Sequence, residues 1–226
     1  MQPGSFEEVS EAILALFAPF SETEERIALM LYRLLAEGGP ISNQALASAA
    51  GLSPAETERM LSRWPGVYRD DDRCIIGYGG LTIAETGHRI QIDRNTRYTW
   101  CAWDALFIPQ LLGVSARVES SCAATGEPIA LTVHPDGIEA PAKPAAVSLI
   151  APDPAGAAAD IVRHFCCHVQ FFAAARAGHE WVAKRLGTFL ATLEQAWQLG
   201  RRHNALRYPG FPATVRSQRA PHCRAR

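Results

Sequence analysis

Apolar residues recur at helical spacing near the start of the chain and predict two amphipathic helices. The first is expected to begin after Ser5 and to stop near Pro19, and the second to run from Ser21 to the sequence Gly38-Gly39-Pro40. Each begins with a serine followed three residues later by a glutamate. Such a pair can satisfy the free backbone amides of a helix N-terminus.

The next segment has the pattern of a helix-turn-helix followed by a hairpin. Short helices are expected over residues 42–50 and 53–62, and a hairpin over residues 67–78. Residues 1–80 are therefore predicted to form a winged-helix-like domain. Such a domain could bind DNA or could cover the active site of the next domain. The second helix contains Arg59 as its single basic residue and the hairpin turn is acidic, which favours the covering role.

After residue 80, short segments with alternating polarity predict strands, and helical segments occur between them without regular alternation. This pattern predicts an α+β fold in which a catalytic domain over residues 81–204 contains small antiparallel sheets. Pro109 is expected to bend or end a helix that includes Cys101. Residues 205–226 are rich in arginine and are predicted to form a disordered tail. The expected strands cover residues 81–83, 89–92, 116–120, 129–133, 146–150, 169–172 and 188–193, and the expected helices residues 153–164, 179–185 and 194–203.

Composition limits the classes of partner. With 22 basic and 23 acidic residues among 226, the formal net charge is −1, so no global attraction to nucleic acid or an anionic membrane is expected. None of the six cysteines forms a Cys-x-x-Cys pair, and the chain is long enough to fold around an apolar core without disulfides. Together with the lack of a long apolar run or a basic leader, this predicts a soluble cytoplasmic protein with reduced thiols.

Two short motifs carry the candidate chemistry. The run Trp100-Cys101-Ala102-Trp103-Asp104 places a thiol and a carboxyl three residues apart, which on a helix would share one face. Phe165-Cys166-Cys167-His168 supplies further thiols much later in the chain. A nearby carboxylate or a helix N-terminus would favour the thiolate of Cys101. Two converging sulfurs would bind a soft, thiophilic metal ion.

These motifs resemble those of the alkylmercury (organomercurial) lyase family, whose signature has a Trp-Cys-Ala-x-Asp run and a distant Phe-Cys-Cys-His run. The segments IIGYG and SSCAATGEPIALTV also resemble that family, so the similarity extends from about Ile41 to Asn204. The resemblance implies that Cys101, Asp104 and Cys166 are catalytic and contact mercury. It further implies protonolysis of a carbon–mercury bond that releases the hydrocarbon and leaves Hg(II) on the protein.

The same resemblance suggests the partners of the reaction. No organic cofactor is required, and cytosolic thiols or a mercuric reductase would remove the Hg(II) product. Aromatic residues around the motifs, Trp100, Trp103 and Phe165, suggest an aromatic wall for the organic group of the substrate. Two alternatives remain open: a mercury-responsive winged-helix DNA-binding regulator, and a mercury-binding protein without catalysis.

The remaining thiols receive less specific interpretations. Cys122 is expected to be structural, and Cys167 to assist or merely pack, because adjacent side chains diverge from an extended segment. His168 is left without a role. A structural zinc site built from Cys101, Cys122, Cys166 and His168 is disfavoured, because zinc ligands usually come in closely spaced pairs.

Overall fold

The computed structural model describes residues 4–139 and 145–210. Its first four helices have the predicted order, and serine residues cap all of them. At Ser21 and Ser53 the full reciprocal capping box is present, whereas Ser5 caps Glu8 without the return bond. The first helix is shorter than expected. The helices are α1 (Phe6–Leu14), α2 (Glu22–Glu37), α3 (Asn43–Ala50) and α4 (Pro54–Leu61).

Eight strands form one antiparallel sheet in the order β1-β2-β3-β5-β4-β6-β7-β8. The predicted hairpin over residues 67–78 is its first pair, so the sheet continues across residue 80 into the segment that follows. Strand β8 was not predicted from the sequence. The strands are β1 (Val67–Arg69), β2 (Ile75–Tyr78), β3 (Leu81–Thr82), β4 (His88–Ile92), β5 (Asn95–Thr99), β6 (Ala116–Ser121), β7 (Pro128–His134) and β8 (Gly137–Glu139).

A second antiparallel sheet has the order β10-β9-β11, with the largely apolar and mostly buried β9 in its centre. Two antiparallel sheets with helices packed on them confirm the α+β prediction, although the first sheet is larger than the small sheets expected. The remaining elements are β9 (Ala146–Ile150), α6 (Pro154–Ala159), α7 (Ile161–His164), the 3-10 helix η1 (Cys166–His168), β10 (Phe171–Phe172), α8 (Ala175–Val182), β11 (Thr188–Thr192) and α9 (Leu193–Arg207).

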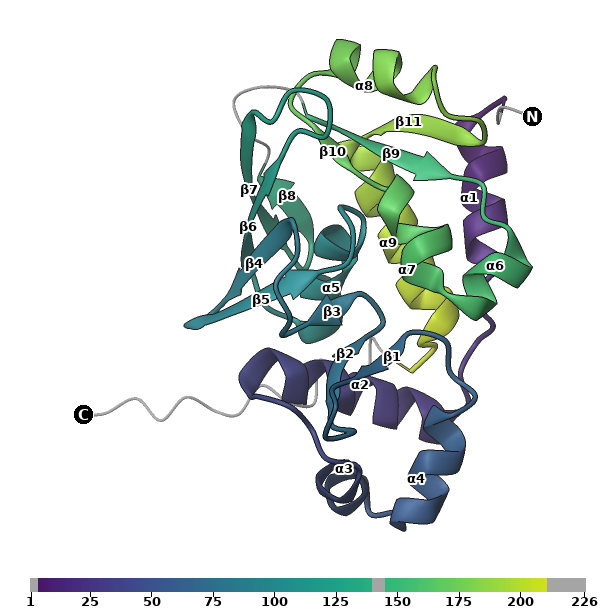
Figure 1. Ribbon diagram of the computed structural model, residues 1–226, viewed down its shortest axis with the longest axis vertical. Coiled ribbons are helices and arrows are strands. Elements are labelled where there is room, and N and C mark those ends of the chain that lie inside the picture. The colour runs from purple at the N-terminus through teal and green to yellow at the C-terminus, as the bar shows by residue number, and fades with distance from the viewer. Residues whose placement is uncertain (1–3, 140–144, 211–226) are drawn as a thin grey trace.

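Figure 1 shows how these elements are arranged. Helices α2, α3 and α4 lie at one end of the molecule, and the second sheet with α8 lies at the other. Between them α5 (Asp104–Leu112) packs against α9. The winged-helix interpretation of residues 1–80 stays a prediction, since the helices and hairpin occur where expected but join the same sheet as the rest of the chain.

Other helix boundaries also differ from the predicted ones. Helix α5 begins at Asp104, after Cys101, and it contains Pro109 before ending at Gly113 in a left-handed conformation. As the sixth residue of α5, Pro109 cannot donate to the Ala105 carbonyl, and the helix ends three residues after it. Helix α8 begins at Ala175, earlier than expected. Helix α9 continues past His203 to Arg207, and Tyr208 is buried directly after it.

The C-terminal tail was predicted to begin at residue 205. Residues 205–210 are ordered parts of the fold, because Gly210 donates a hydrogen bond to Glu25 of α2 at 2.9 Å. Phe20 likewise donates from its backbone to Arg207 at 3.0 Å. The rest of the predicted tail, residues 211–226, lies outside the described part of the chain. Within the described residues, no helix has both the length and the apolar character needed to cross a membrane.

Candidate active site

The two cysteine motifs, distant in sequence, are adjacent in the fold. The first lies in the turn between β5 and α5, and the second spans the end of α7 and the 3-10 helix η1. The backbone amide of Ala102 donates to the carbonyl of Val169 at 3.1 Å, which joins the two segments directly. The rings of Trp103 and Phe165 also meet edge to face, with centroids 6.1 Å apart. The backbone therefore holds the two motifs in one place.

Three polar groups converge where these segments meet. Ligand atoms of Cys101, Asp104 and Cys166 all lie within 4.8 Å of one another. Their side chains are buried, with relative exposures of 0%, 5% and 2% for Cys101, Asp104 and Cys166. Burying a carboxyl and two thiols together is unfavourable unless they pair with one another or with a ligand. The arrangement is the one that the sequence predicted for these three residues.

The way Cys101 meets Asp104 differs from the prediction that both lie on one helical face. Cys101 is in the turn that precedes α5, and Asp104 is the first residue of that helix. The backbone amide of Cys101 donates to Asp104 Oδ2 at 3.0 Å, so the carboxylate folds back over the turn. Thr99 fixes the other side of the turn by donating from Oγ1 to the Cys101 carbonyl at 3.0 Å.

Burial controls the protonation of the cluster. Removal from solvent raises the pKa of Asp104 to about 7, against the lowering effect of its hydrogen bonds with Cys101. Burial, the hydrogen bond with Cys166 and the charge of Asp104 raise the pKa of Cys101 well above its usual value. The sequence-based expectation that a helix N-terminus would favour the Cys101 thiolate is therefore wrong for the free protein. Desolvation of the thiol is the larger effect.

Cys166 is affected by opposing influences. Its hydrogen bond with Cys101 lowers the pKa of Cys166, but burial and the neighbouring charge of Asp104 outweigh that effect, so the pKa lies above its usual value. Both thiols are thus protonated near neutral pH, and Asp104 can exchange a proton there. The two thiols therefore carry protons that a bound metal ion would displace.

Two glycines shape the wall beside Asp104. A Cβ atom on Gly80 would lie 2.5 Å from Asp104 Oδ1, and the backbone of Gly80 has a φ of +98°. Gly79 also has a positive φ, and its carbonyl accepts from the hydroxyl of Tyr32 at 2.7 Å. Only glycine fits Gly80, because the carboxyl occupies the place of a side chain. Gly79 entered the sequence analysis only through the similarity of IIGYG to the family, and Gly80, the next residue, was not singled out.

A cavity of about 360 Å³ opens beside the cluster. Asp104 and Cys166 line it, whereas Cys101 is fully buried and is not among the described residues that line it. Aromatic residues form a large part of its walls and include Trp100, Trp103 and Phe165, as the sequence suggested. The aromatic residues that line the cavity are Phe17, Phe20, Tyr32, Trp64, Tyr78, Trp100, Trp103, Phe107, Phe165 and Tyr208.

The N-terminal segments help to line this cavity, which agrees with the covering role favoured from the sequence, whereas the contribution of α9 was not anticipated. Phe17 and Phe20 come from the segment between α1 and α2, and Trp64 follows α4. His203 of α9 also lines the cavity and was missed, because a single histidine in a helix carries no motif. Trp103 is anchored to the same helix by a hydrogen bond from Nε1 to the Ala196 carbonyl, 3.0 Å long.

The other thiols are separate from the cluster. Cys122 is buried and Cys167 is exposed, with its thiol donating to the Arg163 carbonyl at 2.7 Å. In the described chain, the cluster with the geometry of a metal site contains neither Cys122 nor His168, which disagrees with the alternative of a four-ligand zinc site. Cys166 and Cys167 diverge as expected, although they do so from a 3-10 helix and not from an extended segment.

Comparison with known proteins identifies the family. The model of the MerB family, described as alkylmercury lyase, matches residues 81–204. An alkylmercury lyase of Pseudomonas putida is 42% identical over 75% of this chain and 79% of its own length. The chain belongs to the alkylmercury lyase family. An alkylmercury lyase of Streptomyces lividans is 39% identical over 76% of this chain and 78% of its own length.

A solved structure supports the fold of this family member. The crystal structure of the mercury-bound form of MerB2 superposes with a TM-score of 0.70 and covers 88% of this chain and 97% of the other. Sequence identity to that structure is 22%, so the comparison establishes the common fold. Both recognised motifs fall inside the span matched by the family model.

Proposed function

We propose that this alkylmercury lyase family member cleaves the carbon–mercury bond of organomercurial compounds by protonolysis, using Cys101, Asp104 and Cys166. The observation that carries the proposal is the convergence of two buried thiols and one carboxyl within 4.8 Å. Soft sulfur ligands suit mercury, and the carboxyl can move a proton between sulfur and carbon. The reaction serves mercury detoxification, because it converts an organomercurial into a hydrocarbon and Hg(II).

Binding begins at the cavity. Cys166 and Asp104 line the cavity, so the mercury atom of R–Hg–X meets Cys166 before it reaches the fully buried Cys101. A sulfur–mercury bond forms, and the former ligand X leaves with the proton of that thiol. The aromatic walls hold the organic group R away from water, which keeps the electrostatic interactions of the site strong.

The second thiol completes the reaction. Cys101 transfers its proton to the carboxylate of Asp104 and its sulfur becomes the second sulfur ligand of mercury. Electron donation from two sulfurs makes the mercury-bound carbon more basic. Asp104 then protonates this carbon, the carbon–mercury bond breaks, and R–H leaves with Hg(II) bound between Cys101 and Cys166. Asp104 is close enough to contact mercury during these steps and regains its starting charge at the end.

The carboxyl is suited to this transfer. Burial raises the pKa of Asp104 to about 7, so it can accept a proton from a mercury-bound thiol and release it near neutral pH. A carboxyl with an ordinary pKa would be a weaker proton acceptor. No organic cofactor is needed in this scheme. Exogenous cytosolic thiols, or a mercuric reductase as a partner, remove Hg(II) by ligand exchange in the cytoplasm.

The proposal is tested by following benzene release from phenylmercuric acetate with excess thiol. Wild-type protein is expected to release benzene, and Cys101→Ala or Cys166→Ala to abolish the release. Asp104→Asn is expected to lower turnover about 100- to 10,000-fold, the usual contribution of a positioned acid or base. It keeps both sulfurs, so it should still bind Hg(II).

Cys167→Ala is the matched control, because this exposed neighbour lies outside the three-residue cluster. Its benzene release should equal that of the wild type. Full activity in any of the three cluster variants, or no benzene from the wild type, contradicts the proposal.

A further inference from the structure

The cavity contains a histidine whose protonation pattern can be read from its neighbours. Nδ2 of Asn204 donates to the Phe107 carbonyl at 3.2 Å and to Gln110 Oε1 at 2.6 Å. A backbone carbonyl can only accept, so the orientation of the Asn204 amide is settled and its Oδ1 is an acceptor. Oδ1 lies 3.2 Å from Nδ1 of His203, which must therefore carry the hydrogen.

The other ring nitrogen of His203 is consequently an acceptor. His203 is 3% exposed and lines the cavity. Nε2 makes no hydrogen bond with the described part of the chain. Because Nδ1 is engaged by Asn204 and the ring lines the cavity, Nε2 is the ring nitrogen left for a ligand there.

Aromatic rings surround His203 and hold it in place. Its ring centroid lies 4.6 Å from that of Phe17, 4.9 Å from that of Phe107 and 5.4 Å from that of Trp103. Burial lowers the pKa of His203 to about 3, so the ring is neutral at physiological pH. A fixed, neutral acceptor in an aromatic wall can receive a hydrogen bond and does not attract anions.

We propose that His203 is a specificity-determining residue whose Nε2 accepts a hydrogen bond from a hydroxyl or N–H group on the organic part of the substrate. This inference rests on the proposed function, since it assigns the cavity to the group R of R–Hg–X. The preferred substrates are arylmercurials that carry a hydrogen-bond donor on the ring. An unsubstituted or methylated ring leaves Nε2 without a partner once water is displaced.

The test compares hydroxyphenylmercury with methylphenylmercury, each as the 3- and 4-isomer. Hydroxyl and methyl groups are similar in size, and only the hydroxyl donates. The hydroxyl also changes the intrinsic basicity of the mercury-bound carbon. The hydroxyl-to-methyl ratio of kcat/KM values is therefore compared between the wild type and the His203 variants, because the intrinsic effect is the same in each protein and cancels. Replacing His203 by Phe keeps a ring of similar shape without the acceptor, and His203→Gln keeps an acceptor.

For at least one isomer, the ratio of kcat/KM for the hydroxyl compound to kcat/KM for the methyl compound is expected to be higher in the wild type than in His203→Phe. The expected difference is about two- to tenfold, the usual range for one hydrogen bond. His203→Gln should restore part of the preference. Equal ratios in the wild type and His203→Phe overturn the inference while leaving the proposed function intact. If no enzyme releases any hydrocarbon, the proposed function itself fails.

A measurement without variants covers the case in which His203→Phe does not fold. Phenol and toluene are tested as inhibitors of wild-type turnover of phenylmercury. Phenol is expected to inhibit at a several-fold lower concentration than toluene, although toluene is the more apolar of the two. Equal inhibition, or stronger inhibition by toluene, contradicts a hydrogen-bond acceptor in the wall of the cavity.

Discussion

At the scale of single residues, Asp104 shows how burial defines the chemistry of the cluster. The carboxyl has one backbone donor, the Cys101 amide at 3.0 Å, and two thiols beside it. That is too little to stabilise a full negative charge away from water, so its pKa is raised to about 7. The same shift has a consequence for stability that does not depend on catalysis.

We expect Asp104 to destabilise the folded protein increasingly as pH rises. Its pKa is about 7 when folded against 3.8 as the ordinary value, so the folded state binds the proton more tightly. The free energy of unfolding that this tighter proton binding contributes is fully present below the pKa of Asp104 in the unfolded chain. It is lost as pH rises through the pKa of Asp104 in the folded protein. Asp104→Asn does not titrate and should gain stability relative to the wild type between pH 5 and pH 8, as measured by urea unfolding. A difference in free energy that stays constant over this range would contradict the raised pKa.

At the scale of elements, the turn between β2 and β3 positions the carboxyl. Gly80 allows the chain to pass against Asp104, and its carbonyl accepts from the Trp100 amide at 2.9 Å. The turn therefore contacts both ends of the first cysteine motif. Its backbone conformation is a requirement of the site and not only of the sheet.

Gly80→Ala is expected to lower turnover by about 100-fold or more, because the new methyl group displaces the carboxyl and a shift of about 1 Å is enough for such a loss. Gly126→Ala is the matched control, since Gly126 also has a positive φ of +73° but no atom lies near its Cβ position. That control should lose about 1–2 kcal/mol of stability and keep its kcat. Benzene release and urea unfolding measure both variants. Equal rates of benzene release by Gly80→Ala and Gly126→Ala would contradict the prediction, because they would show that turnover does not depend on the position of the Asp104 carboxyl.

At the scale of the whole molecule, the N-terminal elements help to enclose the cavity. The segment between α1 and α2 and the residues after α4 contribute aromatic side chains to its wall. The buried Tyr208, which follows α9, closes the same wall. Residues from the N-terminal segments and from the region of α9 thus complete a cavity whose Asp104 and Cys166 come from the intervening part of the chain.

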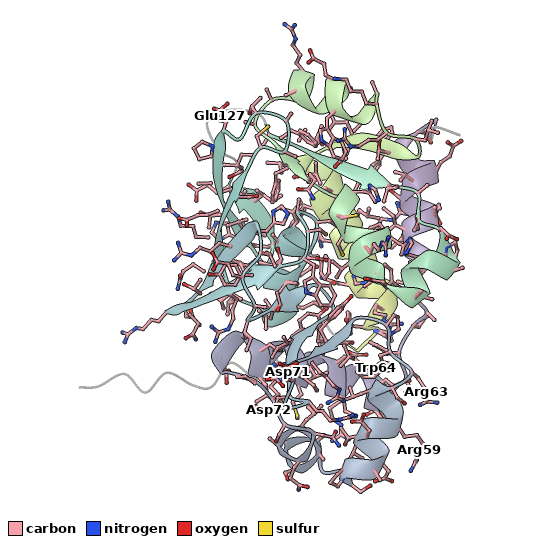
Figure 2. All side chains as sticks on the ribbon, viewed as in Figure 1. Arg59, Arg63, Trp64, Asp71, Asp72 and Glu127 are labelled. Atoms are coloured by element: carbon pink, nitrogen blue, oxygen red, sulfur yellow. The ribbon has the colours of Figure 1, made fainter. Side chains whose placement is uncertain are left out.

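This use of the N-terminal elements weighs against a DNA-binding regulator. Figure 2 shows Arg59 and Arg63 projecting from the region of α4, while Asp71 and Asp72 lie at the turn of the β1–β2 hairpin. The acidic pair would repel phosphates where a wing would approach them. Nearby Arg69 is already paired with Glu58 at 2.8 Å.

We therefore expect no sequence-dependent gel shift with duplex DNA at moderate salt, with or without Hg(II). The control is a double variant, Arg59→Ala with Arg63→Ala, which should behave like the wild type. A mercury-responsive shift in the wild type that this double variant loses would support the regulator and contradict the expectation.

Much of the fold could be predicted from local patterns. Strand β9 and helix α2 were predicted almost to the residue, because a buried strand and a capped amphipathic helix have strong local signals. The start of α5 was not, since the residues before Asp104 include no side chain that caps the helix. Strand β8 is short and depends on its pairing with β7.

The sequence by itself determined which residues are the candidates for the chemistry, because thiols and a carboxyl that match the family's motifs occur in two short runs with distinctive neighbours. Only the tertiary structure decided how Cys101 and Cys166 meet, that burial raises their pKa values, and that His203 of α9 lines the same cavity as the aromatic residues of the N-terminal segments. The physical reason is that proton affinity and cavity shape depend on solvent exclusion by segments far apart in the chain, and no local pattern records which segments will pack together.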